Sequence, residues 1–343
     1  MEIDNLVRSN VKRLQPYSCE REDYKRQGFS LLDANENPYG GIYRRYPDPL
    51  QQELKQCLRE VKGFTPERLT IGNGSDELID LLLRTFCSPR EDNIITISPT
   101  YPMYGIYAQV NEVEIRESLL DKDLMPVPED ILGRADKHTK LIFLCTPNNP
   151  TGNTIPLDTI CRLACRFQGL VVVDEAYIDF TDSPSATSIQ NRYPNIVVLQ
   201  TLSKAWGAAG LRVGVCIADP AVTGWLNKVK APYNLNSFAQ ECAKALLQEQ
   251  DKVQAQMKEI IQERERLIEG LRQIPDLRIM GKPEANFILV QHGRYRELYQ
   301  YLLDNRVAVR LRDMPPLLPG CLRITVGKRE ENDKVIRLCQ TFQ

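Results

Sequence analysis

The sequence has little of what would tie it to a membrane, a secretory route or a metal ion. No stretch approaches the roughly 20 continuous apolar residues that a membrane helix needs, and the N-terminal segment MEIDNLVRSNVKRL has no apolar core for a signal peptide. The ten cysteines are scattered and form no CxxC pair, so a zinc site is not expected. We therefore expect reduced thiols in a cytoplasmic protein.

The sequence also has few histidines and a net charge close to zero. The two histidines, His138 and His292, stand alone in the sequence, which disfavours chemistry based on histidine. Lysine and arginine number 44 against 45 aspartates and glutamates, a formal net charge of -1. Because nucleic-acid binders usually carry a basic excess, this balance argues against nucleic acid as a partner. It leaves room for a local basic site that binds a small anion.

Apolar runs through the middle of the chain predict a buried, mainly parallel sheet. Such runs, without polar alternation, suit strands that are covered on both faces. Helical patterns at Asp76–Phe86 and Leu157–Phe167 lie between them, and alternating strands and helices predict an α/β layered domain. The apolar runs are Ile94–Ile97, Leu141–Cys145, Leu170–Val173, Ile196–Leu199 and Val213–Ile217.

The chain has 343 residues, more than one hydrophobic core usually serves, so two domains are expected. A charged segment, 237–274, predicts one or two long helices that lead out of the sheet domain. The short strands and helices after Pro275, including a strand at Val307–Leu311, predict a smaller α+β domain. We predict an N-terminal segment, 1–40, that packs on the small domain, a large domain over 41–240, and an interdomain helix with the small domain over 241–343.

Polar segments follow several of the predicted strands. In open α/β sheets, ligands bind beyond the carboxyl ends of the strands. TPNNPTG (146–152), DEAY (174–177) and TLSK (201–204) each follow an apolar run, and GNGSDE (72–77) precedes the first helix. A lysine, an aspartate, an asparagine and a glycine-rich helix start at one sheet edge suit a phosphorylated cofactor.

In this order and spacing, the segments resemble the fold-type I enzymes that use pyridoxal 5′-phosphate (PLP). In detail they are similar to the histidinol-phosphate aminotransferase family, and the resemblance covers nearly the whole chain from Leu14. It implies a large domain with a mainly parallel seven-stranded sheet, a smaller α+β domain, and a homodimer with composite active sites. It also implies that Lys204 carries PLP as a Schiff base.

Lys204 and Asp174 are the residues on which this interpretation depends. A Schiff base needs a neutral amine, and the pKa of a lysine falls readily in a desolvated or cationic site. Asp174 ends a buried strand, where an isolated carboxylate is costly. Pairing with the protonated pyridine nitrogen of PLP would compensate that cost and keep the ring an electron sink. The alternative for Lys204 is a lysine on the protein surface. The alternative for Asp174 is the N-cap of a helix.

The resemblance assigns further contacts with the cofactor. Tyr177 and Asn149 would bind its phenolic oxygen, and Tyr101 would stack on its ring. Without the resemblance, Tyr177 is interpreted as a core tyrosine, Asn149 as a turn-forming residue and Tyr101 as a core packing residue. A helix start offers backbone N–H groups and a favourable dipole to a phosphate. The phosphate-binding residues would be Gly74, Ser75, Asp76, Thr201, Ser203 and Arg212, with Tyr46 reaching the phosphate of the neighbouring subunit.

Arg323 stands on an apolar strand, where an arginine is rarely buried unless it is paired. The resemblance implies that it binds the phosphate of one substrate and the carboxylate of the other, with bidentate geometry. Arg310 would be a second phosphate-binding arginine. The alternative is a surface residue whose aliphatic side-chain carbons pack on the protein while the guanidinium stays in water. Tyr17 and Asn37 would complete the substrate site, although turn chemistry also accounts for the Asn-Pro pair.

The implied reaction converts L-histidinol phosphate and 2-oxoglutarate into imidazole acetol phosphate and L-glutamate, a step of histidine biosynthesis. Two alternatives share the cofactor residues: a threonine-phosphate decarboxylase and a broad aromatic or aliphatic aminotransferase. A PLP-binding transcription regulator differs in kind. Such regulators carry an additional N-terminal DNA-binding domain, and the residues before Lys204 leave no room for one.

Overall fold

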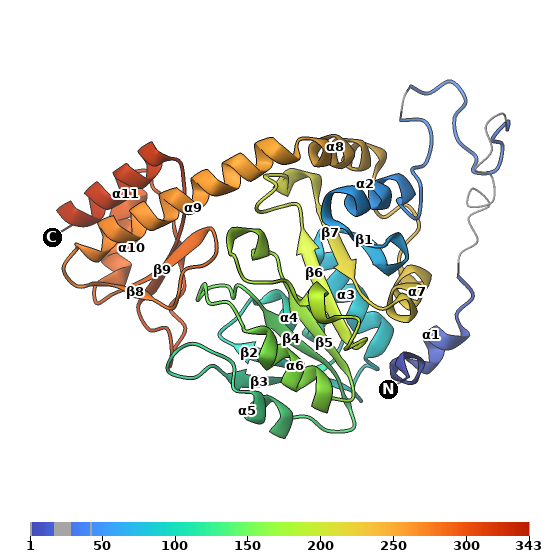
Figure 1. Cartoon of the computed structure of the whole chain (residues 1–343), viewed down its shortest axis with the longest axis horizontal. Coiled ribbons are helices and arrows are strands. Elements are labelled where there is room, and N and C mark those ends of the chain that lie inside the picture. The colour runs from blue at the N-terminus through green and yellow to red at the C-terminus, as the bar shows by residue number, and fades with distance from the viewer. Residues whose placement is uncertain (1, 17–28, 42, 343) are drawn as a thin grey trace.

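A twisted seven-stranded sheet forms the centre of the larger part of the molecule (Figure 1). The computed structural model describes residues 2–16, 29–41 and 43–342. Every strand runs in the same direction except β7, which is antiparallel to both of its neighbours. In spatial order the strands are β1 (Leu69–Asn73), β7 (Val213–Ile217), β6 (Ile196–Thr201), β5 (Leu170–Asp174), β4 (Thr139–Cys145), β2 (Asn93–Ser98) and β3 (Glu114–Leu119).

Helices cover both faces of this sheet. Alternate residues of each central strand point into opposite cores: Val172 packs with α3, α4 and α7, and Val171 packs with α2, α6 and α8. Both valines are fully buried, as expected for strands without polar alternation. The helices are α2 (Gln52–Lys62), α3 (Ser75–Phe86), α4 (Met103–Val110), α5 (Pro128–Gly133), α6 (Leu157–Arg166), α7 (Pro220–Val229) and α8 (Ser237–Gln248).

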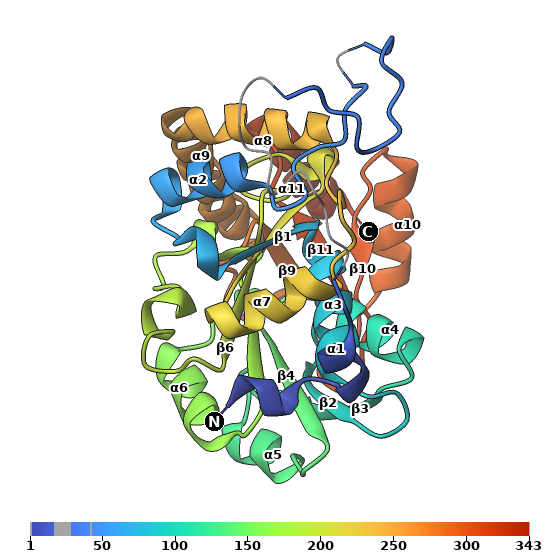
Figure 2. The same ribbon diagram turned by 90° about the vertical axis from the view of Figure 1, so that its right-hand side faces the viewer.

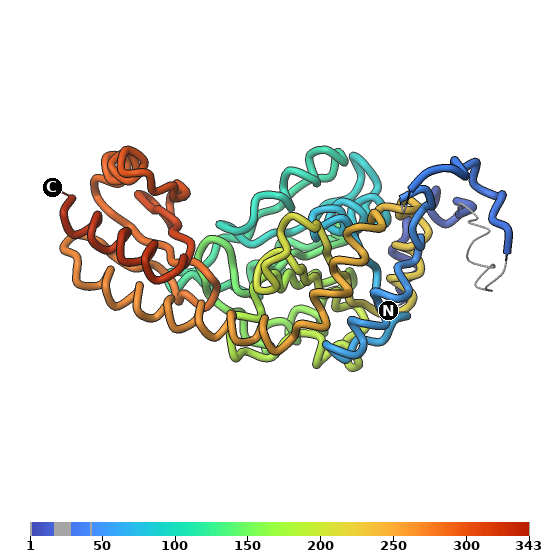
Figure 3. Tube along the Cα trace, turned by 90° about the horizontal axis from the view of Figure 1, so that it is seen from above, coloured from blue at the N-terminus to red at the C-terminus, as the bar shows by residue number. Residues whose placement is uncertain are grey.

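A second sheet forms the small domain, and α9 (Gln250–Arg272) runs from one domain to the other (Figures 1 and 3). This sheet is antiparallel, and one face packs on α9, α10 and α11 through residues such as Ile288 and Leu322. The opposite face carries Phe287 and Leu289, which belong to the core of the large domain. The elements are β10 (Arg310–Leu311), β11 (Cys321–Thr325), β9 (Phe287–His292), β8 (Leu277–Met280), α10 (Tyr295–Asp304) and α11 (Arg329–Thr341).

The start of the chain packs on the large domain, which corrects our expectation that the N-terminal segment packs on the small domain. Helix α1 (Ser9–Arg13) and the 3-10 turn Ile3–Leu6 lie beside α3 and α7 (Figure 2). The reason is an apolar stripe, Ile3, Val7 and Val11, that is buried with α3 and α7. The indole N–H of Trp225 in α7 donates to Asp4 at 2.7 Å and fixes the same contact.

The sequence missed two strands and overestimated a third. β1 is short and contains a glycine, and β3 is a polar edge strand of sequence EIRESL, so neither has an apolar run. The strand predicted at Val307–Leu311 contains only the two residues of β10. Within the described residues, no helix is both long and apolar enough to cross a membrane.

Further elements are single turns of 3-10 helix. They connect or end the larger elements and do not contribute a layer of their own. They are Pro66–Arg68, Ile178–Phe180, Ala186–Ile189 and Ala209–Leu211.

Candidate active site

A polar pocket opens beyond the carboxyl ends of β4, β5 and β6, where the sequence predicted a ligand site. Its lining comes from segments that are far apart in the chain and meet because their strands are neighbours in the sheet. The lining residues are Ser75, Asp76, Tyr101, Cys145, Asp174, Ala176, Tyr177, Thr201, Ser203, Lys204 and Arg212.

Lys204 follows β6 and reaches the pocket from one side. Its ammonium lies 5.7 Å from the centre of the Tyr177 ring. Burial lowers the pKa of Lys204, and the nearby Arg323 guanidinium lowers it further against the opposing effect of Asp174. Because a nucleophilic amine must be neutral, this environment prepares Lys204 to react with a carbonyl group.

Asp174, the last residue of β5, lies at the floor of the pocket and is 3% exposed. Tyr104 OH donates to Asp174 Oδ2 at 2.7 Å, and the Ala176 N–H donates to Oδ1 at 3.1 Å. Burial nevertheless raises the pKa of Asp174 to about 6, because two neutral donors do not replace bulk water. The carboxylate is therefore poised to accept a buried cationic N–H from a ligand.

Aromatic side chains bound the pocket on both sides. Tyr177 packs edge-on against Phe287 of the small domain, with ring centres 5.1 Å apart. Tyr101 lies edge-on to Tyr104 at 5.6 Å, and its hydroxyl donates to Asp76 Oδ1 at 3.0 Å. Burial raises the pKa of both Tyr101 and Tyr177, so both phenols are protonated hydrogen-bond donors at neutral pH.

The first turn of α3 forms one end of the pocket. Ser75 and Asp76 are its first residues, and the backbone N–H groups of a first helical turn have no partner within the helix. The Gly74 N–H donates to Arg212 O at 2.7 Å and is therefore not available to a phosphate. The backbone donors expected for a phosphate are the N–H groups of the residues after Gly74. Glycine is favoured at position 74 for a different reason: its φ of +79° is a conformation that residues with a side chain rarely adopt.

Hydroxyl and guanidinium groups surround the same helix start. Thr201 Oγ1 donates to Ser203 Oγ at 3.0 Å, and Arg212 Nη1 donates to Ser203 Oγ at 3.5 Å. Arg212 also lies 3.5 Å from the Asp76 carboxylate. A helix N-terminus with hydroxyls and a guanidinium is a general site for a phosphate.

Arg323 connects the small domain to this site. It stands on β11 and donates to Asn149 Oδ1, which is buried in the loop after β4. Its guanidinium lies 5.2 Å from the centre of the Phe287 ring, and burial lowers its pKa. The contact brings both predicted residues to the rim of the pocket from separate sheets.

The other predicted site residues are not in the pocket of this chain. Tyr46 is 51% exposed and stacks on Tyr233, with ring centres 4.5 Å apart, in a separate groove. Asn37 is exposed and accepts the Tyr39 N–H at 2.9 Å. Arg310 is exposed on β10, opposite Arg323. The predicted Tyr17 lies outside the described residues.

Sequence reasoning missed Tyr104 and Arg312. Tyr104 is fully buried, stacks on Phe143 at 4.8 Å and binds Asp174. Tyr104 lies in the first turn of α4, whereas Tyr101 precedes that helix, so no helical spacing connects the two residues and the sequence carried no signal for this contact. Arg312 stands two residues after Arg310, and only the strand register shows which way it faces.

These residues fit pyridoxal phosphate by their chemistry. Lys204 offers an amine of lowered pKa to an aldehyde, and Asp174 offers a buried carboxylate to a pyridinium. Tyr101 and Tyr177 offer aromatic and phenolic contacts, and the start of α3 offers phosphate donors. No cluster of metal ligands is found among the residues that the structure describes.

Comparison with known proteins agrees with this chemistry. The family described as "Aminotransferase class I and II" matches residues 31–338. The chain is 45% identical over 339 residues to a histidinol-phosphate aminotransferase of Flavobacterium johnsoniae, covering 98% of this chain and 97% of the relative.

Solved structures share the fold of this chain. The histidinol-phosphate aminotransferase of Clostridium acetobutylicum is 25% identical, with a TM-score of 0.80 over 87% of this chain and 90% of that one. A histidinol-phosphate aminotransferase of Sinorhizobium meliloti was solved in complex with pyridoxal-5′-phosphate. It shares the fold with a TM-score of 0.80 at 22% identity, over 97% of this chain and 96% of that one.

Proposed function

The chain belongs to the class I and II aminotransferases, and on this premise we propose that it transfers an amino group between L-histidinol phosphate and 2-oxoglutarate. PLP is its cofactor, and imidazole acetol phosphate and L-glutamate are the products, as a step of histidine biosynthesis in the cytoplasm. The observation that carries the proposal is the position of Lys204 and Asp174 in one pocket, an amine of lowered pKa beside a buried acid of raised pKa.

When bound, PLP supplies an electron-withdrawing ring that stabilises negative charge on the substrate carbon. Lys204 would hold the cofactor and then move the proton at that carbon, which its lowered pKa supports. Asp174 would accept the ring N–H, and Tyr104 and Ala176 keep its carboxylate oriented for that bond. The first turn of α3, Ser203 and Arg212 would hold the cofactor phosphate.

Two substrates with different anions must use one site. Histidinol phosphate carries a phosphate and no carboxylate, whereas glutamate carries two carboxylates. Arg323 suits both, because a guanidinium forms bidentate hydrogen bonds with either group. Its present bond to Asn149 and its place over the Phe287 ring hold it at the rim, close enough to Lys204 to affect the pKa of the lysine.

Single-turnover reactions with separate amino donors test this function. Purified protein loaded with PLP is mixed with L-histidinol phosphate, L-glutamate, L-phenylalanine or L-threonine O-phosphate, and the cofactor absorbance is followed. We expect fast spectral changes with the first two and slow ones with phenylalanine. A rate with phenylalanine equal to that with histidinol phosphate would indicate a broad aminotransferase. Release of carbon dioxide from threonine phosphate would indicate a decarboxylase instead.

The finer part of the proposal is a homodimer with shared active sites. Its support is the groove lined by Tyr46, Tyr233 and Phe238, which lies apart from the pocket of the same chain. Large apolar side chains are exposed close by in sequence, Tyr39 at 95% and Leu32 at 91%. A second copy of the chain would cover these side chains and receive Tyr46 at its cofactor phosphate.

Mixing two inactive variants tests the shared site. In a hybrid of Tyr46→Ala and Lys204→Ala subunits, one of the two sites regains both residues. Random pairing should therefore restore about one quarter of the activity of the unmodified enzyme. Light scattering gives the oligomeric state of each variant, and each variant alone is the control. If the mixture stays as inactive as its parts although both variants are dimers, Tyr46 does not act across the interface.

A further inference from the structure

Three arginines lie together on one face of the small-domain sheet, at the edge formed by β10 and β11. In the antiparallel pair of β10 and β11, Arg310 lies directly opposite Arg323, and opposite residues point to the same side. The Arg312 N–H donates to Cys321 O at 2.8 Å, so the ladder continues and places Arg312 on that same side. The other side is apolar and holds Leu322, which is fully buried in the small-domain core.

No carboxylate balances these arginines among the described residues. Arg323 donates to Asn149 and lies over Phe287, and Arg312 Nη1 donates to the Leu311 carbonyl at 3.2 Å. Burial lowers the pKa of Arg312, and Arg323 and Arg310 lower it further. Like charges held together in a partly buried place are unfavourable, which indicates a site built to receive an anion.

Arg312 is less exposed than Arg310, and its charge acts on Tyr177. Burial raises the pKa of Tyr177, and the two guanidinium groups that oppose this rise are those of Arg323 and Arg312. Tyr177 lines the pocket beside Lys204. Arg312 is partly buried, whereas Arg310, two residues earlier on the same face, is exposed.

We infer that Arg312 is an additional specificity-determining residue, which joins Arg323 in binding the phosphate of the amino donor. This inference rests on the proposed function, whose substrate it refines. A phosphate dianion carries more charge than a carboxylate and has three acceptor oxygens, so it benefits more from a second guanidinium. Arg312 would thus favour phosphorylated donors over glutamate.

The test compares Arg312→Gln with Arg278→Gln as a matched control. Arg278 is exposed on β8 and stands in the same cross-strand row as Arg312, on the same face but at the opposite edge of the sheet. Half-saturation concentrations are measured in single-turnover reactions with L-histidinol phosphate, L-histidinol and L-glutamate. We expect Arg312→Gln to raise the value for histidinol phosphate about 10- to 30-fold and to change the value for histidinol less than about twofold. Arg278→Gln should change neither.

Two further measurements keep the outcome decisive. Arg312→Lys should recover part of the affinity for histidinol phosphate, because it keeps the charge and loses the planar fork. Equal losses for histidinol phosphate and histidinol, or no loss for either, would overturn the inference. Calorimetry with inorganic phosphate on the PLP-loaded protein separates the two proposals. If wild type does not react with histidinol phosphate, the proposed function fails. In that case Arg312 stands only if its replacement still weakens phosphate binding about tenfold.

Discussion

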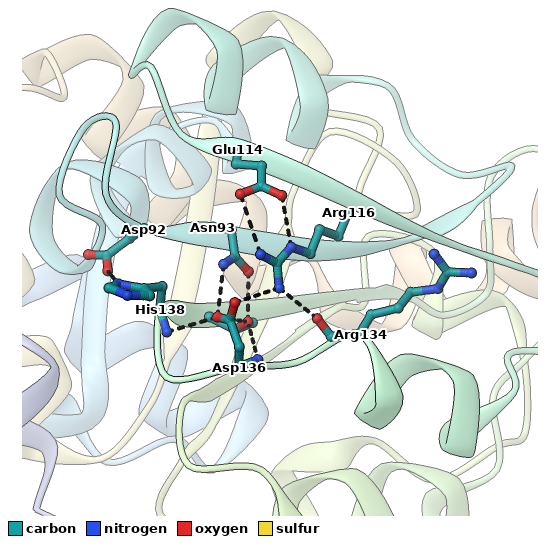
Figure 4. A network of polar contacts seen from close by, with 8 residues as sticks. Asp92, Asn93, Glu114, Arg116, Arg134, Asp136 and His138 are labelled. Carbon is teal, nitrogen blue, oxygen red and sulfur yellow. Dashed lines mark hydrogen bonds and ion pairs between the residues drawn. The ribbon is translucent and has the colours of Figure 1, made fainter.

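The two ends of the large sheet hold charges in opposite ways. At the N-terminal ends of β2, β3 and β4, polar side chains satisfy one another (Figure 4). Arg116 lies 2.8 Å from the Glu114 carboxylate and 2.9 Å from that of Asp136, and Asn93 donates to Asp136 at 3.1 Å. The hydrogen bond from Asn93, followed by those from the His138 N–H and Arg116, lowers the pKa of Asp136. Arg116, Glu114 and Asp136 thus have charged partners within the protein.

At the opposite end of the large sheet, beyond β5 and β6, the charged groups are less well compensated. Burial raises the pKa of Asp174 to about 6 and lowers that of Lys204. Arg323 and Arg312 add positive charge without an acid among the described residues. One end of the sheet thus stabilises the fold, and the other end keeps groups in costly states that a ligand can relieve. Variants at the two ends should therefore affect different measurements.

The largest effect is expected for Lys204→Ala. Turnover should fall at least about 10,000-fold, because the variant loses both the amine that holds the cofactor and the proton carrier. Thermal stability of the protein without cofactor should change little or rise, since a partly buried cation is removed. Steady-state rates and melting curves measure the two effects. Activity within tenfold of wild type would remove Lys204 from the site.

Asp174→Asn should lower kcat about 100-fold, because a neutral amide replaces the charge-assisted bond to the ring nitrogen. The same change should stabilise the cofactor-free protein at neutral pH. The pKa of Asp174 in the folded protein, about 6, lies above the 3.8 of an unperturbed aspartate. The unfolded chain therefore ionises first, and wild type loses stability relative to the variant as the pH rises from about 4 to about 6.

This pH-dependent difference in unfolding free energy between wild type and Asp174→Asn amounts to about 3 kcal/mol above pH 6 and is absent below pH 4. Denaturant titrations of both proteins between pH 4 and pH 8, with and without PLP, measure it. Bound PLP should cancel or reverse the advantage of the variant, because its ring N–H pairs with the carboxylate. A constant difference at all pH values would show that Asp174 is not a destabilised acid.

Tyr104→Phe should have a smaller effect on the same group. Its hydroxyl bond to Asp174 Oδ2 lowers the pKa of the carboxyl, so its loss should raise that pKa above about 6. A hydrogen bond from a hydroxyl to a carboxylate contributes about 1.5 kcal/mol, which corresponds to about a tenfold loss in kcat. The pH dependence of stability, measured as for Asp174→Asn, should move to higher pH. An unchanged dependence would mean that Tyr104 serves packing alone.

The sequence predicted the active-site end of the sheet better than the rest. Strands β2 and β4 to β7 follow from their apolar runs, and the residues that end β5 and β6 lie in the pocket as the strand-end rule requires. Strand β3 has no such run, because its side chains at the edge of the sheet are polar and mostly accessible to water.

What the sequence could not supply is side-chain direction and packing between distant segments. Tyr104 reaches Asp174 only because α4 packs on β2 and β3 and Tyr104 stacks on Phe143 of β4. Arg312 lies on the same side of the small sheet as Arg323 only through the pairing of β10 with β11. The apolar stripe at Ile3, Val7 and Val11 has helical spacing, but its spacing does not identify the surface that covers it.

Arg116→Gln should have the smallest effect and complete the comparison. The side chain is 27% exposed and its partners are more exposed, so the ion pairs are screened and their loss should cost about 1 kcal/mol of stability. Because the pKa of Asp136 is lowered in the folded protein, its contribution to stability is lost as the pH falls through the acid range. The variant should therefore lose some of the acid sensitivity of wild type, while kcat stays unchanged. A kcat that fell together with stability would show that the two ends of the sheet are coupled, since Arg116 lies at the far end of the strands from Lys204.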